Sequence, residues 1–257
     1  MFNWVMASTD RLRQITEAVR EAGRVGVTEL AALTGTSEMT IRRDLEVLAD
    51  QGVLERYRGG ARSLLLRGEE PPFALRAQEG TDVKRRIAAE VADLIADGES
   101  VVLDSGTTCL EVARALEHRR LTVAPLSLHA VNALAGALNV TLLVPGGHPR
   151  SGELALTGPL TQASLAALRF DTAVIGCCGL TAADGLTAYD LDDAAVKRAA
   201  IASARRVIAV TESAKLSRTA LAFVAPASAL HALVTDDAAP EDETGAIAAA
   251  GVTVRKV

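Results

Sequence analysis

The stretch Ser37-Glu38-Met39-Thr40-Ile41-Arg42-Arg43-Asp44-Leu45 decides how the N-terminal part of this chain folds. It predicts a helix that begins after its serine, because serine is a favoured N-cap and a glutamate in the first turn complements the helix dipole. Ile41, Leu45 and Leu48 recur at helical spacing, so they lie on one stripe that the protein can bury. The stretch is therefore predicted to be an amphipathic helix whose second face is available to a partner.

The opposite face of this helix is centred on Met39 and Arg43 and flanked by Thr40 and Arg42. Two guanidinium groups and a hydroxyl near a helix N-terminus suit phosphate contacts and guanine edges in a DNA major groove. Paired arginines on an amphipathic helix are also typical of a face that is simply solvated. The helix by itself leaves both interpretations open, and its neighbours favour DNA binding.

The residues before this helix predict a helix-turn-helix. Residues 10–23 carry apolar side chains at helical spacing and stop at a glycine. Thr28 is a candidate cap for a second, short helix that ends at Gly35. The segment Gly35-Thr36-Ser37 then has the length and the glycine of a helix-turn-helix link. Residues 1–8 are expected to be an unstructured leader.

The residues after the helix predict a basic β-hairpin. Two short strand-like runs flank Gly59-Gly60, a pair that suits the primed turns of tight hairpins. Arg56, Arg58 and Arg62 would line this hairpin. A basic hairpin after the third helix is a wing, so residues 8–66 are predicted to form a winged helix-turn-helix domain whose wing contacts the DNA backbone.

Three motifs closely resemble the N-terminal signature of the DeoR family of bacterial repressors: Val27-Thr28-Glu29-Leu30-Ala31, Thr40-Ile41-Arg42-Arg43-Asp44-Leu45 and Gly59-Gly60-Ala61. Arg58 stands where the family usually has histidine, a change that keeps a hydrogen-bond donor and adds charge. The resemblance implies that double-stranded operator DNA is a partner. The residues expected to contact it are Ser37, Met39, Thr40, Arg42, Arg43, Arg56, Arg58 and Arg62.

Composition limits the class of protein. A chain of 257 residues that is 49% hydrophobic can bury a sizeable core, and it has no apolar run long enough to span a membrane. The N-terminus lacks the basic and apolar regions of a signal peptide, so a cytoplasmic protein with no membrane partner is expected. Cys109, Cys177 and Cys178 have neither C-x-x-C spacing nor histidine partners, which favours reduced thiols and predicts no metal site or cofactor.

Net charge does not by itself support DNA binding. Residues 8–62 contain nine arginines and nine acidic residues, so the remaining chain carries the whole formal charge of −5. DNA-binding domains usually carry a net positive charge, and this one is neutral. Only the position of its arginines, on the third helix and the wing, favours DNA binding. Such a domain should bind weakly as a monomer, so a homo-oligomer, dimer or tetramer, is expected to act on repeated half-sites.

The larger C-terminal part alternates between strand-like and helical patterns. Gly68-Glu69-Glu70-Pro71-Pro72 and its surroundings lack periodicity, so residues 67–82 are predicted to be a linker and residues 83–257 a second domain. Helical patterns such as Lys84–Ala96 and Thr108–Leu116 separate most of the apolar runs. The alternation predicts an α/β domain with a mostly parallel sheet flanked by helices. Its expected strands are Ser100–Leu103, Leu121–Ala124, Val140–Val144, Ala173–Ile175, Arg206–Val210, Ala232–Val234 and Val252–Val254.

Glycine-bearing turns follow three of these strands. Ligands of parallel sheets bind beyond the carboxyl ends of the strands, where Asp104-Ser105-Gly106-Thr107-Thr108 joins a strand to a helix. Its hydroxyls, its glycine and the free N–H groups of the helix can hold an anion, although an ordinary capped turn has the same composition. Gly146-Gly147 and the segment from Gly176 to Gly179 follow two further strands. Such turns are what a phosphosugar pocket needs.

Lysine is scarce, with four lysines against 23 arginines. Lys197 and Lys215 match positions where the DeoR family's regulatory domain carries a lysine. An ammonium group is a point-charge partner for phosphate, and surface solvation is the alternative. In that family the domain resembles ribose-5-phosphate isomerase and senses phosphorylated sugars or related metabolites. The resemblance therefore implies an effector site formed by Asp104, Ser105, Gly106, Thr107, Thr108, Gly146, Gly147, Gly179, Lys197 and Lys215.

The C-terminal domain departs from the family pattern in two places. Pro125-Leu126-Ser127 stands where the family usually has Thr-Asn-Ser, which removes an amide that could contact the effector. Glu212 replaces the common aspartate, a milder change. The first departure predicts an unusual effector or an altered mode of binding.

We therefore expect a transcriptional repressor of a carbohydrate-catabolism operon, which a phosphorylated sugar relieves by shifting the population away from the DNA-competent arrangement. One alternative is an enzyme of the sugar-phosphate isomerase type with a DNA-binding appendage. Asp104, Asp184 or Glu212 would then be the general base, but no clear acid–base pair is present and no catalytic residue is assigned. The other alternative is an activator, which the residues do not distinguish from a repressor.

Overall fold

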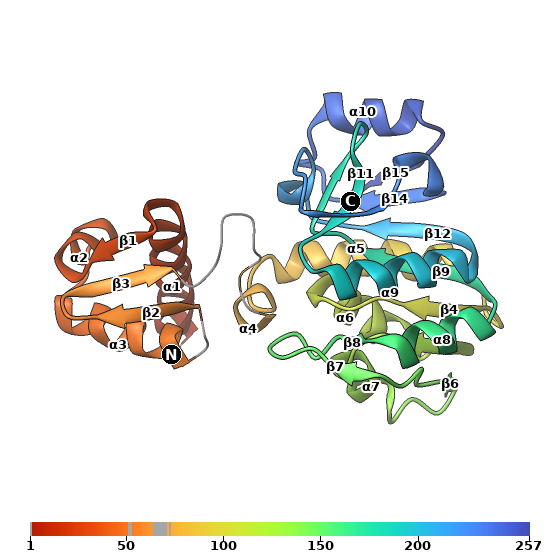
Figure 1. Cartoon of the computed structure of the whole chain (residues 1–257), viewed down its shortest axis with the longest axis horizontal. Coiled ribbons are helices and arrows are strands. Elements are labelled where there is room, and N and C mark those ends of the chain that lie inside the picture. Colours follow the sequence, from red (N-terminus) through yellow and green to blue (C-terminus); the bar gives the residue numbers. More distant parts are fainter. Residues whose placement is uncertain (1, 51–52, 64–70, 72) are drawn as a thin grey trace. The chain divides into compact units, whose positions relative to one another are not determined.

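The computed structural model describes residues 2–50, 53–63, 71 and 73–257. It divides into two compact units, Met1–Glu79 and Gly80–Val257 (Figure 1). The division falls inside the segment 67–82 that the sequence predicts to be a linker, of which residues 67–70 and 72 lie outside the described residues. Each unit has its own buried apolar core.

The N-terminal unit is a winged helix, as predicted. Its helices and its three-stranded antiparallel sheet, with strand order β1-β3-β2, surround a core that includes Ile15, Leu30 and the predicted stripe Ile41, Leu45 and Leu48. The elements are α1 (Phe2–Ala22), β1 (Arg24–Gly26), α2 (Val27–Thr34), α3 (Glu38–Asp50), β2 (Leu54–Tyr57), β3 (Gly60–Ser63) and the short α4 (Phe73–Arg76).

Two expectations about the helices of this unit are wrong. Residues 2–8 belong to α1, which begins at Phe2, and are not an unstructured leader. Helix α2 begins at Val27 with Gly26 as its N-cap, so Thr28 does not cap it. The Glu29 carboxylate instead accepts a hydrogen bond from the Gly26 N–H at 3.3 Å, while the Thr28 hydroxyl donates to Glu38 at 2.7 Å. The start of the helix is therefore held by the carboxylate three residues after the cap.

The tip of the hairpin also differs from the prediction. Tyr57 pairs with Gly60, so the two turn residues are Arg58 and Gly59. A primed turn needs a positive φ at its first turn residue, but only the second, Gly59, has one, at +100°. This sign pattern is that of a type II turn. Gly60 is required for another reason, because a Cβ there would lie 2.2 Å from the carbonyl oxygen of Val25 on β1.

The C-terminal unit is built on a parallel sheet of seven strands in the order β15-β14-β12-β9-β4-β5-β6. All seven predicted strands are present in it. The strands are β4 (Ser100–Leu103), β5 (Leu121–Pro125), β6 (Val140–Leu142), β9 (Phe170–Gly176), β12 (Ala204–Val210), β14 (Ala232–Thr235) and β15 (Thr253–Lys256). The helices are α5 (Thr81–Leu94), α6 (Thr107–Leu116), α7 (Leu128–Leu134), α8 (Pro159–Ala167), α9 (Leu191–Ala202) and α10 (Glu241–Ala249), with 3-10 turns at Ser213–Lys215 and Ala227–Ala229.

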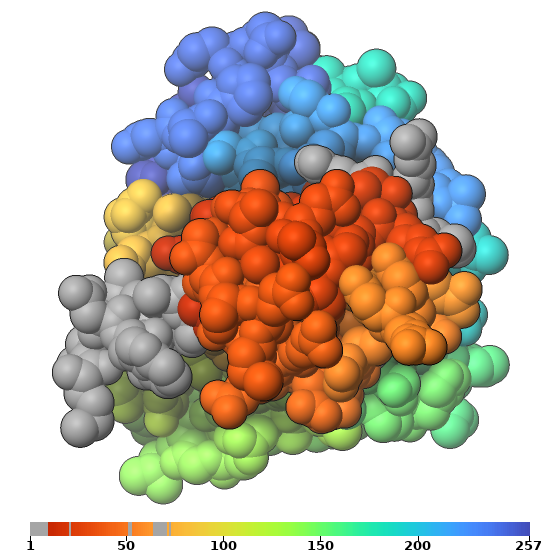
Figure 2. Space-filling model, turned by 90° about the vertical axis from the view of Figure 1, so that its left-hand side faces the viewer, coloured from red at the N-terminus to blue at the C-terminus, as the bar shows by residue number. Residues whose placement is uncertain are grey.

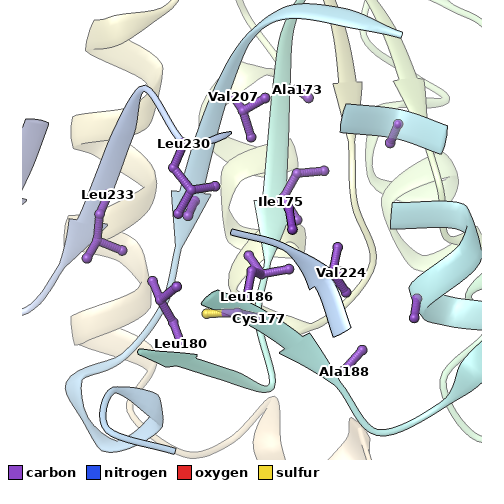
Figure 3. Packing of buried hydrophobic residues seen from close by; sticks show 14 of the residues in the cluster. Ala173, Ile175, Cys177, Leu180, Leu186, Ala188, Val207, Val224, Leu230 and Leu233 are labelled. Carbon is purple, nitrogen blue, oxygen red and sulfur yellow. The ribbon is translucent and has the colours of Figure 1, made fainter. Parts of the chain in front are cut away.

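Both faces of this sheet are buried. Successive residues of β9 alternate between two cores: Ala173 and Ile175 pack with residues of α8, α9 and α10, and Val174 packs with residues of α5, α6 and α7. Figure 3 shows the first of these cores, where Ile175 of β9 lies near Leu186, and Val207 of β12 lies beside Ala173. A strand that faces helices on both sides reads as a continuous apolar run, which is why the sequence predicts these strands well.

Two smaller sheets were not predicted. One is antiparallel, with the order β10-β11-β13, and it covers part of the first core; the other is the pair β7-β8. These strands are β7 (His148–Pro149), β8 (Leu156–Thr157), β10 (Gly179–Thr181), β11 (Gly185–Ala188) and β13 (Ala222–Ala225).

The strand order fixes where a ligand would bind. The chain runs outward from β4 through β5 to β6, then returns to place β9 on the other side of β4. The connections after β4 and β9 therefore leave the sheet in opposite directions. In an open parallel sheet, this switch point leaves a crevice at the carboxyl ends of the two strands.

Candidate functional site

The first candidate site is the exposed face of α3. The Ser37 hydroxyl accepts a hydrogen bond from the Thr40 N–H at 3.2 Å, which confirms Ser37 as the N-cap. Met39 is 63% exposed, and Arg42 and Arg43 are also exposed. Thr40 is half-buried, and its hydroxyl lies 3.0 Å from that of Ser37. The helix thus presents the face that its spacing predicts.

Three of the arginines expected at DNA are held by glutamates. Arg42 pairs with Glu38 at 3.3 Å, Arg56 with Glu46 at 3.4 Å, and Arg62 with Glu55 at 2.6 Å. All six side chains are well exposed, so these pairs add little stability and can exchange for a phosphate.

Arg43 and Arg58 differ from these three. In the part of the chain that the structure describes, their side chains have no hydrogen bond or ion pair. Arg43 lies on the exposed face of α3, and Arg58 lies at the tip of the β2-β3 hairpin. Figure 2 shows one face of this unit in red and orange, with the lighter orange of the hairpin at one side of it. These two guanidinium groups are ready to accept an anionic partner.

Two further contacts of this unit were missed. Arg11 of α1 donates two hydrogen bonds to Asp44 of α3, at 2.6 and 3.1 Å, and this partly buried pair joins the two helices. The hydrogen bond to Asp44 raises the pKa of the Arg11 guanidinium. Arg24 lies over the ring of Tyr57, 3.9 Å from its centroid, and so stacks on the hairpin. Neither contact has a sequence signal, because the partners are far apart in the chain.

The second candidate site is the switch point of the parallel sheet. Asp104 follows β4 and is 1% exposed; it accepts a hydrogen bond from the N–H of Gly176, the last residue of β9, at 2.9 Å. The ammonium of Lys197, from α9, donates to Asp104 and to the Gly176 carbonyl oxygen, the latter at 3.2 Å. Asp193, one turn earlier in α9, lies 3.5 Å from the same ammonium. The structure therefore joins the predicted Asp104 and Lys197 directly.

Burial controls the charges in this cluster. Burial raises the pKa of Asp104, against the opposing effect of Lys197. Burial alone would lower the pKa of Lys197, but Asp104 and Asp193 outweigh it and hold that pKa well above its usual value. Burial also raises the pKa of the neighbouring Cys109 thiol, with Asp104 adding to the effect. Lys197 thus stays charged, and Cys109 stays a protonated, unreactive thiol.

The predicted anion loop lies beside this cluster. Ser105, Thr107 and Thr108 are each more than nine-tenths buried, and their hydroxyls have no hydrogen-bond partner among the described residues. Gly106 has φ +100° and directly precedes α6, whose first backbone hydrogen bond is donated by Leu110 to the Gly106 carbonyl oxygen at 3.0 Å. Hydroxyls and free N–H groups together at a helix start suit an anion.

Two more lysines reach the same edge of the sheet. The ammonium of Lys215, in the 3-10 turn after β12, donates to the carbonyl oxygen of Cys177 at 3.2 Å. Lys84 of α5 is 2% exposed and pairs with Glu212 at 3.5 Å. Lys84 was not predicted as a site residue. Its signal was the scarcity of lysine, because three of the four lysines gather at this edge.

Two of the predicted glycines have packing reasons of their own. A Cβ on Gly147 would lie 2.0 Å from the Thr161 hydroxyl oxygen, and one on Gly179 would lie 2.4 Å from the carbonyl oxygen of Arg218. Gly146 accepts a hydrogen bond from the Thr161 hydroxyl at 2.8 Å. None of these contacts tests whether the three glycines touch an effector, so that role stays a prediction.

The Pro125-Leu126-Ser127 departure has a structural consequence. Leu126 is buried in the first core of the C-terminal unit, so it offers no polar group to a ligand. Ser127 caps α7 by accepting a hydrogen bond from the Ala130 N–H at 3.2 Å. A hollow of about 580 Å³ opens between α6 and α7, and it contains none of the predicted effector residues.

The described residues contain neither a cluster of metal ligands nor a membrane-spanning helix. Among them no three His, Cys, Asp or Glu side chains are grouped so that they could hold a metal ion. None of the helices within the described part is long and apolar enough to cross a membrane.

Comparison with known proteins matches each unit to a described protein family. The family description "DeoR-like helix-turn-helix domain" matches residues 11–65, and "DeoR C terminal sensor domain" matches residues 79–237. The chain belongs to the DeoR family. The glycerol-3-phosphate regulon repressor of Escherichia coli K12 is 32% identical over 91% of this chain and 93% of its own length. The transcriptional regulator GlpR of Haloferax volcanii is 31% identical over 97% of this chain and 98% of its own length.

A solved structure of ribose 5-phosphate isomerase A from Methanocaldococcus jannaschii is also similar to part of this DeoR-family chain. It is 18% identical, with a TM-score of 0.40, over 54% of this chain and 55% of that one. A likeness of this extent says nothing about activity.

Proposed function

We propose that this DeoR-family protein is a DNA-binding transcriptional repressor of a carbohydrate-catabolism operon and that a phosphorylated sugar or related metabolite relieves it. The observation that carries the proposal is the exposed face of α3, on which Arg43 has no protein partner among the described residues. The curated relatives are named as transcriptional regulators, and one is named for glycerol 3-phosphate, a small phosphate ester. That name supports an effector of the same chemical class.

The proposed DNA contacts divide between helix α3 and the wing, which is the β2-β3 hairpin. Thr40, Arg42 and Arg43 read base edges in the major groove, with Ser37 and Met39 at the same helix start. Arg56, Arg58 and Arg62 contact phosphates from the wing. Because the arginines and acidic residues of this domain balance, we propose that two or more copies bind together as a homo-oligomer in the cytoplasm.

The proposed effector site is the carboxyl edge of the parallel sheet. Its residues are Asp104, Ser105, Gly106, Thr107, Thr108, Gly146, Gly147, Gly179, Lys197 and Lys215. We propose a sensor rather than an enzyme, because the buried carboxylate Asp104 is tied to Lys197 and to a backbone N–H and so is poorly placed as a general base. Effector binding then shifts the population away from the DNA-competent arrangement.

The test is the affinity for duplex DNA from the region upstream of this gene and its neighbours. Arg43→Ala should weaken binding by about 1–3 kcal/mol, measured by fluorescence anisotropy at fixed salt. Arg13→Ala is the matched control: it removes the same charge from an exposed position on α1, where Arg13 pairs only loosely with Asp10 at 3.8 Å. Equal affinity of the Arg43→Ala variant and the parent would overturn the proposed DNA face.

The direction of regulation needs a second measurement. A reporter fused to the adjacent operon should rise when this gene is deleted, because a repressor has then been lost. A fall in the reporter would show an activator and would leave the DNA face in place.

A further inference from the structure

The turn at the tip of the wing is attached to the rest of the N-terminal unit and is not a free loop. Its two turn residues are Arg58 and Gly59, and Tyr57 directly precedes them. We infer that Tyr57 and Arg24 are positioning residues, which fix this turn against β1 so that Arg58 is presented to DNA in one orientation. The inference deepens the proposed DNA-binding function and rests on it.

Tyr57 reaches across the sheet from β2 to β1. In the register of the sheet Tyr57 pairs with Gly60 of β3, and Gly60 pairs with Gly26 of β1. The Tyr57 hydroxyl donates a hydrogen bond to the Val25 carbonyl oxygen at 3.3 Å. The side chain therefore crosses the middle strand β3 and joins β2 to β1, two strands that do not pair with each other.

This crossing requires glycine at position 60. A Cβ on Gly60 would lie 2.5 Å from the Tyr57 hydroxyl oxygen and 2.7 Å from a carbon of its ring. Glycine within a strand often marks a place where another group approaches the backbone closely, and here that group is the tyrosine ring. Gly60 and Tyr57 therefore form one contact, and neither can change alone without moving the ring.

Arg24 of β1 packs on the same ring. Its guanidinium carbon lies 3.9 Å from the centroid of the Tyr57 ring, a distance typical of a stacked cation–π pair. Within the described part of the chain the Arg24 side chain has no hydrogen bond or ion pair, so the ring is its partner. The tyrosine is thus held to β1 at two points, by its hydroxyl and by its ring.

A third contact holds the other end of the turn. The Gly59 carbonyl oxygen accepts a hydrogen bond at 2.9 Å from the N–H of Val27, the first residue of α2. The first N–H groups of a helix have no partner inside the helix, so this bond satisfies one of them and also fixes the turn. Arg58 therefore lies between two attached residues, while its own side chain has no hydrogen bond or ion pair among the described residues.

A fixed turn favours binding because its order exists before the partner arrives. Immobilising side chains and loops opposes association, and a preorganised loop avoids part of that cost. If the turn moved freely, part of the attraction between Arg58 and a DNA phosphate would be lost in ordering the turn. Tyr57 and Arg24 should therefore act on DNA through Arg58, which distinguishes them from residues that contact DNA directly.

A double-mutant cycle on the full chain measures this coupling, with duplex DNA from the region upstream of this gene as the probe. Arg58→Ala should lower the slope of log affinity against log salt concentration by about 1, as expected for one lost phosphate contact. Tyr57→Ala should weaken binding by about two- to tenfold, the range that corresponds to ordering one side chain. In the Arg58→Ala background, Tyr57→Ala should have no further effect on affinity.

Three further variants complete the cycle. Arg24→Lys keeps the charge and removes the planar stack, so it should weaken binding only where Arg58 is present. Tyr57→Phe keeps the ring and removes the hydroxyl, so it should fold even if Tyr57→Ala does not, and its smaller loss should also disappear without Arg58. Leu33→Ala is the control for removing an exposed apolar side chain from the same unit, since Leu33 is 58% exposed on α2; it should leave affinity unchanged.

Hydrogen exchange measures the same contacts without DNA. The Val27 amide should exchange faster in Tyr57→Ala than in the parent, because its acceptor Gly59 then lies on a turn that opens more often. The Val53 amide is the reference within the same unit, since it donates to the Leu48 carbonyl oxygen, also at 2.9 Å, and should keep its rate. Equal acceleration of both amides would show a general loss of stability and would overturn the positioning role.

The affinities can also overturn the inference. Equal losses from Tyr57→Ala with and without Arg58 would show that the tyrosine acts on DNA or on the fold independently of that arginine. Unchanged affinity in Arg24→Lys would remove Arg24 from the inference. If the parent binds no duplex, the proposed DNA-binding function fails and this inference with it. If the parent binds and both tyrosine variants bind equally well, the inference alone fails.

Discussion

The two units of this protein use their cations in opposite ways. In the winged helix, Arg42, Arg56 and Arg62 lie on the surface, each beside a glutamate at 2.6–3.4 Å. In the sensor unit, Lys84 and Lys197 are almost completely buried, and each is paired with a carboxylate. Every basic side chain of the first unit is an arginine, while three of the four lysines meet at one edge of the second.

This difference separates pairs that can exchange from pairs that cannot. An exposed pair is screened by water and salt, so replacing its glutamate with a DNA phosphate costs little. A buried pair lost its hydration when the chain folded, so either partner left alone is destabilising. Charge at the surface is therefore free for recognition, and buried charge holds the local geometry in place.

Asp104→Ala tests the buried side of the comparison and should have the largest effect. The substitution leaves the Gly176 N–H without an acceptor and takes the nearest carboxylate away from Lys197. We expect the free energy of unfolding to fall by about 3–5 kcal/mol in urea titrations. Asp97→Ala is the control, since Asp97 is exposed and pairs with Arg119 at 2.7 Å; it should cost far less stability than Asp104→Ala. Equal losses for the two variants would remove the distinction between buried and exposed pairs.

Asp44→Ala tests an intermediate case within the winged helix. Asp44 accepts two hydrogen bonds from Arg11, and both side chains are mostly but not fully buried. Hydrogen bonds to charged groups are worth about 1.5–3 kcal/mol, so we expect a loss in this range for the unfolding of the N-terminal unit. Arg13 and Asp10, which pair at 3.8 Å on the surface of the same helix, give the control variant Asp10→Ala. A loss below that of Asp10→Ala would show that Arg11 finds other partners without cost.

The sequence predicts the parts of this fold whose signal is local. The stripe Ile41, Leu45 and Leu48, the Ser37 cap and the seven apolar strands each depend on residues within one turn or one strand, and all are present. The antiparallel sheet β10-β11-β13 was missed because its strands are only three or four residues long and pair across connections of unequal length. Local patterns do not encode pairings of that kind.

The candidate site divides in the same way. The loop Asp104–Thr108 follows a strand, so the rule for parallel sheets places it at the edge without further information. The pairing of Asp104 with Lys197 joins residues 93 positions apart, and only the strand order brings them together. Lys84 was missed because nothing beside it in the chain distinguishes a buried lysine from a solvated one at a helix start.

Glu38→Gln tests the exposed side of the comparison and should have the smallest effect on folding. Glu38 holds Arg42 at 3.3 Å and accepts a hydrogen bond from Thr28 at 2.7 Å, and these contacts lower the pKa of its carboxyl group, with Thr28 the larger cause. Glutamine keeps the hydrogen bond to Thr28 but removes an exposed charge, so the free energy of unfolding should change very little. DNA binding should tighten, because Arg42 is released and one negative charge leaves the face that approaches phosphates. The gain should shrink as salt rises, since it is electrostatic.

Val47→Gln, at an exposed position on the same helix, leaves charge unchanged and should leave affinity unchanged. Weaker DNA binding by Glu38→Gln at every salt concentration would mean that the Glu38–Arg42 pair orients Arg42 for its contact, and the exposed pairs would then fix side-chain geometry just as the buried ones do.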